Sequence, residues 1–238
     1  MTESDWTKFY YASPEPSRLP AEVRRTTALP QLASPGPQLV FATFLGRVMA
    51  SQPERVAGWI EELRDLTGAG RTTLEIAARF SRTPAGLAWL QRIGSPALRG
   101  EPPDLFALPV DDGTMLDMLW SHYFATGEAR AVRRIVTAFE KLGSSGAAAA
   151  YATSGQTEAD RKRANEDAVY SAASWSLTSM MTEHAPLLTI AEDLVAAPAL
   201  SPNERVSVAM CLERAAPSRW RVVIDPVSKS ATIQRLAR

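Results

Sequence analysis

The stretch from 115 to 142, MLDMLWSHYFATGEARAVRRIVTAFEKL, constrains the fold more than any other part of the chain. Its apolar residues recur every three or four positions, which places them on one face of a helix before Gly127 and on one face of a second helix after it. Glycine just past a helix end adopts the left-handed conformation without steric cost, so Gly127 marks the turn. Because so short a connection makes the two helices antiparallel neighbours, the sequence predicts a helical hairpin.

The same helical pattern continues along most of the chain. Further helices are predicted at 20–29, 39–49, 56–66, 74–80, 84–93, 161–181, 187–195 and 206–215. The helix at 39–49 is apolar nearly all round, apart from Gln38 beside it and Arg47, and is therefore expected to be central. We predict a mainly α fold in one domain over 1–238, with antiparallel helical hairpins stacked as an irregular superhelix or bundle, TPR- or HEAT-like in outline.

Several local signals refine this outline. Ser51 and Ser201 each precede a glutamate by three residues, with proline in the first turn, and both are predicted capping boxes. The proline-rich connection at 94–110 is expected to hold at most one helical turn, at 104–108. Residues 143–160 are small and polar without an apolar stripe, which predicts a mobile loop.

An aromatic cluster lies near the beginning of the chain, at Trp6, Phe9, Tyr10 and Tyr11. It could form an aromatic ligand site. The simpler interpretation is that these rings cover the end of a helical stack and shield its core from water.

Only the C-terminal end departs from the helical pattern. Segments 220–224 and 230–234 are rich in β-branched residues and flank a turn-forming stretch, which predicts a β-hairpin over about 220–234. An exposed strand edge can accept a strand from a partner protein or from a second copy of the chain. The candidate partner-binding residues are therefore the apolar ones of this hairpin, Trp220, Val222, Ile224 and Ile233, and a homodimer through the hairpin is one expectation.

Composition narrows the class of protein. Hydrophobic residues make up 45% and charged residues 22%, as in ordinary globular proteins, and 26 basic residues balance 26 acidic ones. We therefore expect no nucleic-acid partner, and the basic residues of the second central helix, Arg130, Arg133 and Arg134, are interpreted as a solvated face because acids accompany them. No apolar run reaches membrane-spanning length and the start lacks a signal peptide. The expected location is the cytoplasm, or the periplasm if a leader was removed.

Residues that usually carry chemistry are few. Cys211 is alone, which excludes an internal disulfide and a thiolate metal cluster. His122 and His184 are the only histidines, and Asp117 lies five residues before His122, a poor spacing for two ligands of one metal on a helix. The stretch 67–73 contains glycines, but it lacks the first glycine and the lysine that the phosphate-loop pattern requires. We assign no catalytic residue, cofactor or metal ligand from the sequence.

Three runs carry a resemblance. PERVAGWI at 53–60, LDMLWSHYFATGEARAVRRI at 116–135 and AASWSLTSM at 172–180 resemble a group of bacterial all-helical proteins that share an LDMLW, FATG and VRRI helix-turn-helix signature. The resemblance implies a bacterial source and a helical fold. It implies no activity, because that group has no known function.

Three functions are consistent with these patterns. The first is a non-enzymatic interaction or scaffold module that grips a protein partner with its stacked helices. The second is an enzyme or small-molecule binder with a groove near His122, Tyr123 and Asp117. The third is a structural component of a bacterial envelope or secretion assembly.

Overall fold

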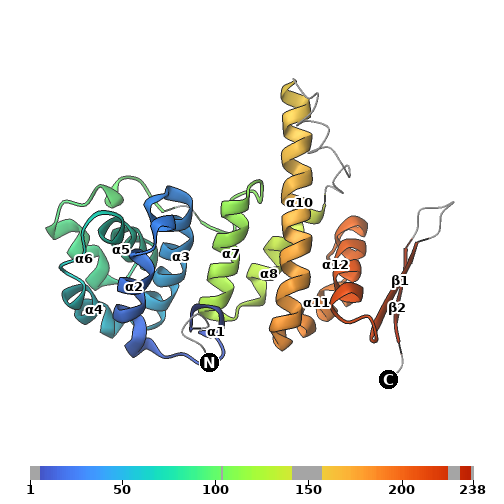
Figure 1. The fold of residues 1–238 in the computed structure, drawn as a ribbon, viewed down its shortest axis with the longest axis horizontal. Helices are drawn as coiled ribbons and strands as arrows, with labels where there is room; N and C mark the ends of the chain where they lie inside the picture. Colours follow the sequence, from blue (N-terminus) through green and yellow to red (C-terminus); the bar gives the residue numbers. More distant parts are fainter. Residues whose placement is uncertain (1–5, 103, 141–156, 225–230, 237–238) are drawn as a thin grey trace. The chain divides into compact units, whose positions relative to one another are not determined.

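The computed structural model describes residues 6–102, 104–140, 157–224 and 231–236. This part of the chain is mainly helical and carries one two-stranded antiparallel sheet, so the predicted mainly α class with a C-terminal hairpin is confirmed (Figure 1). Most of the loop predicted at 143–160 lies outside the described residues. The prediction is wrong for 158–160, because a helix begins at Glu158 with Thr157 as its N-cap.

Contacts between residues divide the chain into two compact units. Unit 1 comprises Met1–Leu108 and Thr114–Ala131, and unit 2 comprises Pro109–Gly113 and Val132–Arg238. The boundary therefore falls inside helix α8 (Ala129–Val136), which belongs to the predicted central hairpin.

Unit 1 is built from short helices. They are α1 (Trp6–Phe9), α2 (Leu19–Thr27), α3 (Pro35–Ser51), α4 (Val56–Glu62), α5 (Gly68–Ser81), α6 (Pro84–Arg92) and α7 (Gly113–Thr126), with 3-10 turns η2 (Pro16–Arg18), η3 (Pro30–Ala33), η4 (Pro53–Arg55) and η5 (Pro96–Leu98). The predicted central helix is α3, in which Phe44, Leu45 and Val48 are fully buried.

Helices α3 and α5 approach each other closely because residue 46 has no side chain. A Cβ atom at Gly46 would lie 2.8 Å from Phe80 Cβ and 3.0 Å from the Ala77 carbonyl oxygen, closer than such atoms pack. Only glycine therefore permits this helix spacing.

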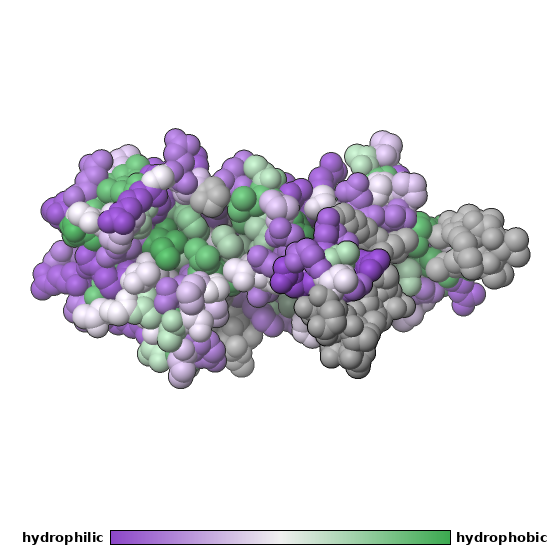
Figure 2. Space-filling model, turned by 90° about the horizontal axis from the view of Figure 1, so that it is seen from above, coloured by the Kyte–Doolittle hydropathy of each residue, from purple (hydrophilic) through white to green (hydrophobic). Residues whose placement is uncertain are grey.

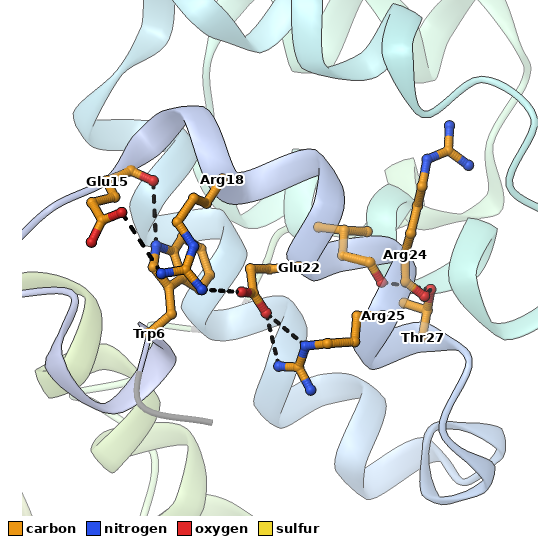
Figure 3. A network of polar contacts seen from close by, with 8 residues as sticks. Trp6, Glu15, Arg18, Glu22, Arg24, Arg25 and Thr27 are labelled. Carbon is orange, nitrogen blue, oxygen red and sulfur yellow. Dashed lines mark hydrogen bonds and ion pairs between the residues drawn. The ribbon is translucent and has the colours of Figure 1, made fainter. Parts of the chain in front are cut away.

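The N-terminal arm closes over this core. Trp6 and Tyr10 are buried, with ring centroids 5.4 Å and 5.7 Å from that of Phe44, so these rings cover the core rather than form an open ligand site. Nearby, the buried Glu22 carboxylate accepts hydrogen bonds from Arg18 at 2.6 Å and from Arg25 at 2.8 Å (Figure 3).

The predicted turn of the central hairpin is confirmed. Gly127 has φ of +71°, and its N–H donates to the Tyr123 carbonyl oxygen at 2.7 Å. The predicted apolar stripes on both sides of this turn are buried, at Leu116, Leu119, Trp120 and Tyr123 in α7 and at Val132, Ile135, Val136 and Phe139 after it.

One of the two predicted capping boxes forms. At Ser201, the side chain accepts from Glu204 N–H at 3.2 Å while the Glu204 carboxylate accepts from Ser201 N–H at 2.8 Å. The prediction at Ser51 is wrong. Helix α3 continues through Ser51, whose hydroxyl donates to the Val48 carbonyl oxygen. The N-cap of the following turn is Gln52, and it makes no side-chain capping bond.

Unit 2 packs three helices together. They are α10 (Glu158–Glu183), α11 (Ala185–Ala196) and α12 (Pro202–Ala215). The 3-10 turn η6 (Thr137–Phe139), which follows α8, packs against α10 and α12. The stripe predicted for α10 is buried at Val169, Ala173, Leu177 and Met181. It faces a core that includes Leu187, Val208 and Leu212.

The C-terminal hairpin consists of β1 (Trp220–Ile224) and β2 (Ala231–Arg235), which pair antiparallel with Trp220 opposite Arg235 and Val222 opposite Ile233. Strand β1 packs against α12. The hairpin is therefore docked on α12, mainly through this strand.

Hydrophilic residues predominate on the face drawn in Figure 2, with hydrophobic residues in smaller areas between them. Among the described residues, none of the helices combines the length and the apolar character that crossing a membrane requires.

The glycine contact leads to a stability prediction. Gly46→Ala should lower the free energy of unfolding by about 1–3 kcal/mol, because the added methyl group overpacks the α3–α5 contact. Gly58→Ala is the matched control, since nothing lies within 4 Å of the added Cβ in α4, and it should be neutral or stabilising by up to about 1 kcal/mol. Urea denaturation of both variants measures this. Equal effects of the two substitutions would contradict the close approach of α3 and α5.

Candidate functional site

Unit 1 contains a cavity of about 320 Å³, which we call the Arg47 pocket. Its walls come from α3, the end of α5, the turn at 104–108, α7 and the start of α8. The ionisable lining residues are Arg47, Arg82, Asp104, His122, Glu128 and Arg130, and the others are Thr43, Phe80, Pro102, Leu105, Phe106, Leu108 and Met118. The pocket therefore combines a charged and an apolar lining.

Arg47 is the least compensated charge in this pocket. It is half-buried, its Nε has no hydrogen-bond partner, and it forms no ion pair with any described residue. Burial lowers the pKa of the guanidinium, and the neighbouring Arg82 and Arg130 add to this, while Glu128 and Asp104 oppose it. A half-buried positive charge without a direct counter-charge favours an anion in the pocket.

His122 lines the Arg47 pocket from helix α7, and its side chain is only 3% exposed. Its Nε2 lies 3.0 Å from Glu128 Oε2, so the Nε2 proton is donated to that carboxylate. Burial lowers the pKa of His122, and the hydrogen bond to Glu128 opposes the shift. At neutral pH the imidazole is therefore uncharged, and its Nδ1 has no hydrogen-bond partner among the described residues.

The turn predicted at 104–108 forms, and it places Phe106 between the His122 imidazole and the Arg130 guanidinium. The prediction of at most one helical turn within 94–110 is wrong, because the 3-10 turn η5 also forms there. Ala107 N–H donates to the Asp104 carbonyl oxygen at 3.0 Å. The Phe106 ring lies edge-on to the His122 imidazole at 4.9 Å, and the Arg130 guanidinium lies 3.5 Å from its centroid. This stack fixes Arg130 at the pocket through a cation–π contact.

Arg82 reaches the pocket from a strained backbone position. It ends α5 with φ of +53°, a left-handed conformation that costs a non-glycine residue about 1 kcal/mol. Its guanidinium donates to the Pro102 carbonyl oxygen at 3.5 Å. An arginine where glycine would fit better is consistent with a functional role for the side chain.

Of the three residues named for a groove, the pocket includes one. His122 lines it, Tyr123 is fully buried in the core, and Asp117 is exposed and outside the lining. The sequence did not identify Arg47, Arg82, Phe106 or Arg130 as site residues. The one available signal was Arg47, a charge inside an otherwise apolar helix.

The hairpin residues named as candidates occupy different environments. Trp220 is 8% exposed and its indole N–H donates to Glu192 Oε1 at 3.1 Å, so this ring docks the hairpin on α11. Val222 and Ile233 are half-buried opposite each other. The Ile224 side chain lies outside what the structure describes.

Metal-binding residues do not cluster in the described part of the chain, where no three His, Cys, Asp or Glu side chains come together. No protein-family model, curated protein or solved structure matches this chain. The resemblance of its three runs to bacterial helical proteins therefore stays a prediction.

The buried histidine predicts a pH effect. The unfolded chain protonates His122 near its ordinary pKa of about 6.5, whereas burial holds the folded-state pKa below that value. The unfolded state thus binds more protons as the pH falls, so stability that is present above about pH 6.5 is lost below it. His122→Gln should flatten this part of the stability curve.

NMR measurement of the imidazole pKa checks the cause, with His122→Gln assigning the two histidine signals. A His122 pKa at or above about 6.5 would contradict the burial argument.

Proposed function

We propose that unit 1 binds a small anionic molecule in the Arg47 pocket. The observation that carries the proposal is that Arg47 lines a cavity of about 320 Å³ without a hydrogen bond or ion pair to any described residue. Cavities of this size are typical of small-ligand sites. Guanidinium groups pair readily with carboxylate and phosphate, and the charge of a half-buried guanidinium is less screened than one in bulk water.

The proposal specifies binding and no reaction. His122 is uncharged and donates to Glu128, so it offers a fixed polar surface beside the anion. The hydroxyl that lines the pocket belongs to Thr43, and it donates to the Leu39 carbonyl oxygen at 2.8 Å.

Direct titration tests this function. Acetate and inorganic phosphate, added separately in a buffer free of other small anions, should raise the melting temperature of the wild-type protein. Arg47→Met keeps the length and apolar stem of the side chain and should weaken binding by about tenfold or more. Without ligand, this variant should be at least as stable as wild type, because it removes a half-buried unpaired charge.

Arg92→Met is the matched control. Arg92 is an exposed arginine of α6 outside the pocket, so its substitution should leave anion binding unchanged. The proposal fails if no small anion binds, neither these two nor a larger one, or if the two substitutions weaken binding equally.

We propose a second function, in which strand β2 pairs with an extended segment of a partner protein through its outer edge. In an antiparallel pair, alternate residues of a strand direct their N–H groups toward the partner strand. Leu236 does so, because its N–H donates to the Arg219 carbonyl oxygen, and the N–H groups of Ile233 and Arg235 therefore point away from β1. No described residue bonds to them. The other edge is covered, since Val222 N–H donates to Glu213.

Ile233→Pro tests this second function. Proline removes one outward N–H without removing a bond between the two strands, so it should abolish partner capture and leave the helices folded. Ile233→Thr is the control that keeps the N–H. Hydrogen exchange in the captured complex should show protection of the Ile233 and Arg235 amides in wild type. Self-association in sedimentation experiments, lost in Ile233→Pro, would instead identify a second copy as the occupant and contradict the partner-protein proposal.

The stacked superhelical arrangement of helical hairpins belongs to this interaction proposal. It would give a partner protein an extended surface to bind. The succession of helices within each unit supports it.

A further inference from the structure

The Arg47 pocket has a lining that restricts which anion it can hold. Its charged groups are contributed by α3, the end of α5, the turn at 104–108 and the α7–α8 region, and its apolar side chains include Phe80, Leu105 and Met118. A ligand that fills the pocket therefore contacts both kinds of wall. An anion that consists of a charged group alone would leave the apolar wall facing water.

The balance of charge favours a single negative charge. Three guanidinium groups and two carboxylates line the pocket, and His122 is neutral, so the lining has a net formal charge of +1. One carboxylate on the ligand neutralises it. A dianionic phosphate would leave a net negative charge beside Asp104 and Glu128.

The three guanidinium groups differ in the contacts that they already make within the protein. Arg130 stacks on the Phe106 ring, and Arg82 donates to the Pro102 carbonyl oxygen. Arg47 has no such contact among the described residues and is the most buried of the three. It is therefore the group that gains most from a carboxylate, which can accept two parallel hydrogen bonds from one guanidinium.

We infer that the ligand is a small monocarboxylate with an apolar body, its carboxylate paired with Arg47 and its body against the wall formed by Phe80, Leu105 and Met118. This inference rests on the proposed anion-binding function. Aromatic rings suit the body, because the wall offers a phenylalanine ring and a methionine sulfur, both of which make favourable contacts with aromatic groups. The small volume of the pocket limits the ligand to about one ring and its side chain.

Four probes separate the contributions of charge and body in calorimetric titrations of the full chain. Phenylacetate carries both features, acetate lacks the body, phenylacetamide lacks the charge, and phenyl phosphate replaces the carboxylate by a dianion near neutral pH. Phenylacetate should bind most tightly, with each of the other three weaker by about tenfold or more.

Two substitutions locate the interactions. Arg47→Met should remove the preference for phenylacetate over phenylacetamide, because the charge it depends on is gone. Arg82→Gly should weaken phenylacetate binding by a few fold without loss of folding, since glycine adopts the φ of +53° found at residue 82 without strain.

The outcomes distinguish this inference from the proposed function. Tighter binding of phenyl phosphate than of phenylacetate, or equal binding of acetate and phenylacetate, would overturn the monocarboxylate with an apolar body and leave anion binding in place. Absence of binding by all three anions would overturn both. Unchanged selectivity in Arg47→Met would overturn the assignment of the carboxylate to Arg47.

Discussion

The close contact of α3 with α5 at Gly46 is the constraint on which the candidate site depends. Phe80 and Ala77 lie so near this position that a side chain larger than hydrogen would separate the two helices. Arg47 follows Gly46 directly, and Phe80 is the residue that the missing Cβ would touch. The close spacing of α3 and α5 therefore also places Arg47 and the Phe80 ring in one pocket.

This arrangement carries features that reduce stability. Arg47 is half-buried without a direct counter-charge, and Arg82 holds a left-handed backbone conformation. A chain that needed only stability could place an apolar residue at 47 and glycine at 82. Residues that lower stability are typical of binding sites, and here Arg47 and Arg82 both line the same cavity.

Unit 2 uses carboxylates differently, to hold a hairpin that would be marginal alone. Glu192 accepts from the Trp220 indole N–H and pairs with Arg219 and Arg235, while Glu213 accepts from Val222 N–H. These contacts fix β1 to the helices and cover its outer edge. The same geometry leaves β2 as the strand whose outward N–H groups find no partner among the described residues.

The sequence by itself determined the local elements, because each depends on residues a few positions apart. Gly127 ended α7, Ser201 and Glu204 capped α12, and β-branched residues formed the hairpin strands, as their patterns predict. The error at Ser51 has the same origin. A capping pattern gives a local preference, and the burial of α3 outweighed it.

Only the tertiary structure decided the Arg47 pocket. Its lining runs from Thr43 to Arg130, and no spacing rule connects such distant residues. The sequence marked Arg47 as an exception in an apolar helix and Arg130 as part of a solvated face, without relating them. Packing of α3, α5 and α7 around the core brings these charges to one cavity, because the helices can reach their spacing only where Gly46 permits it.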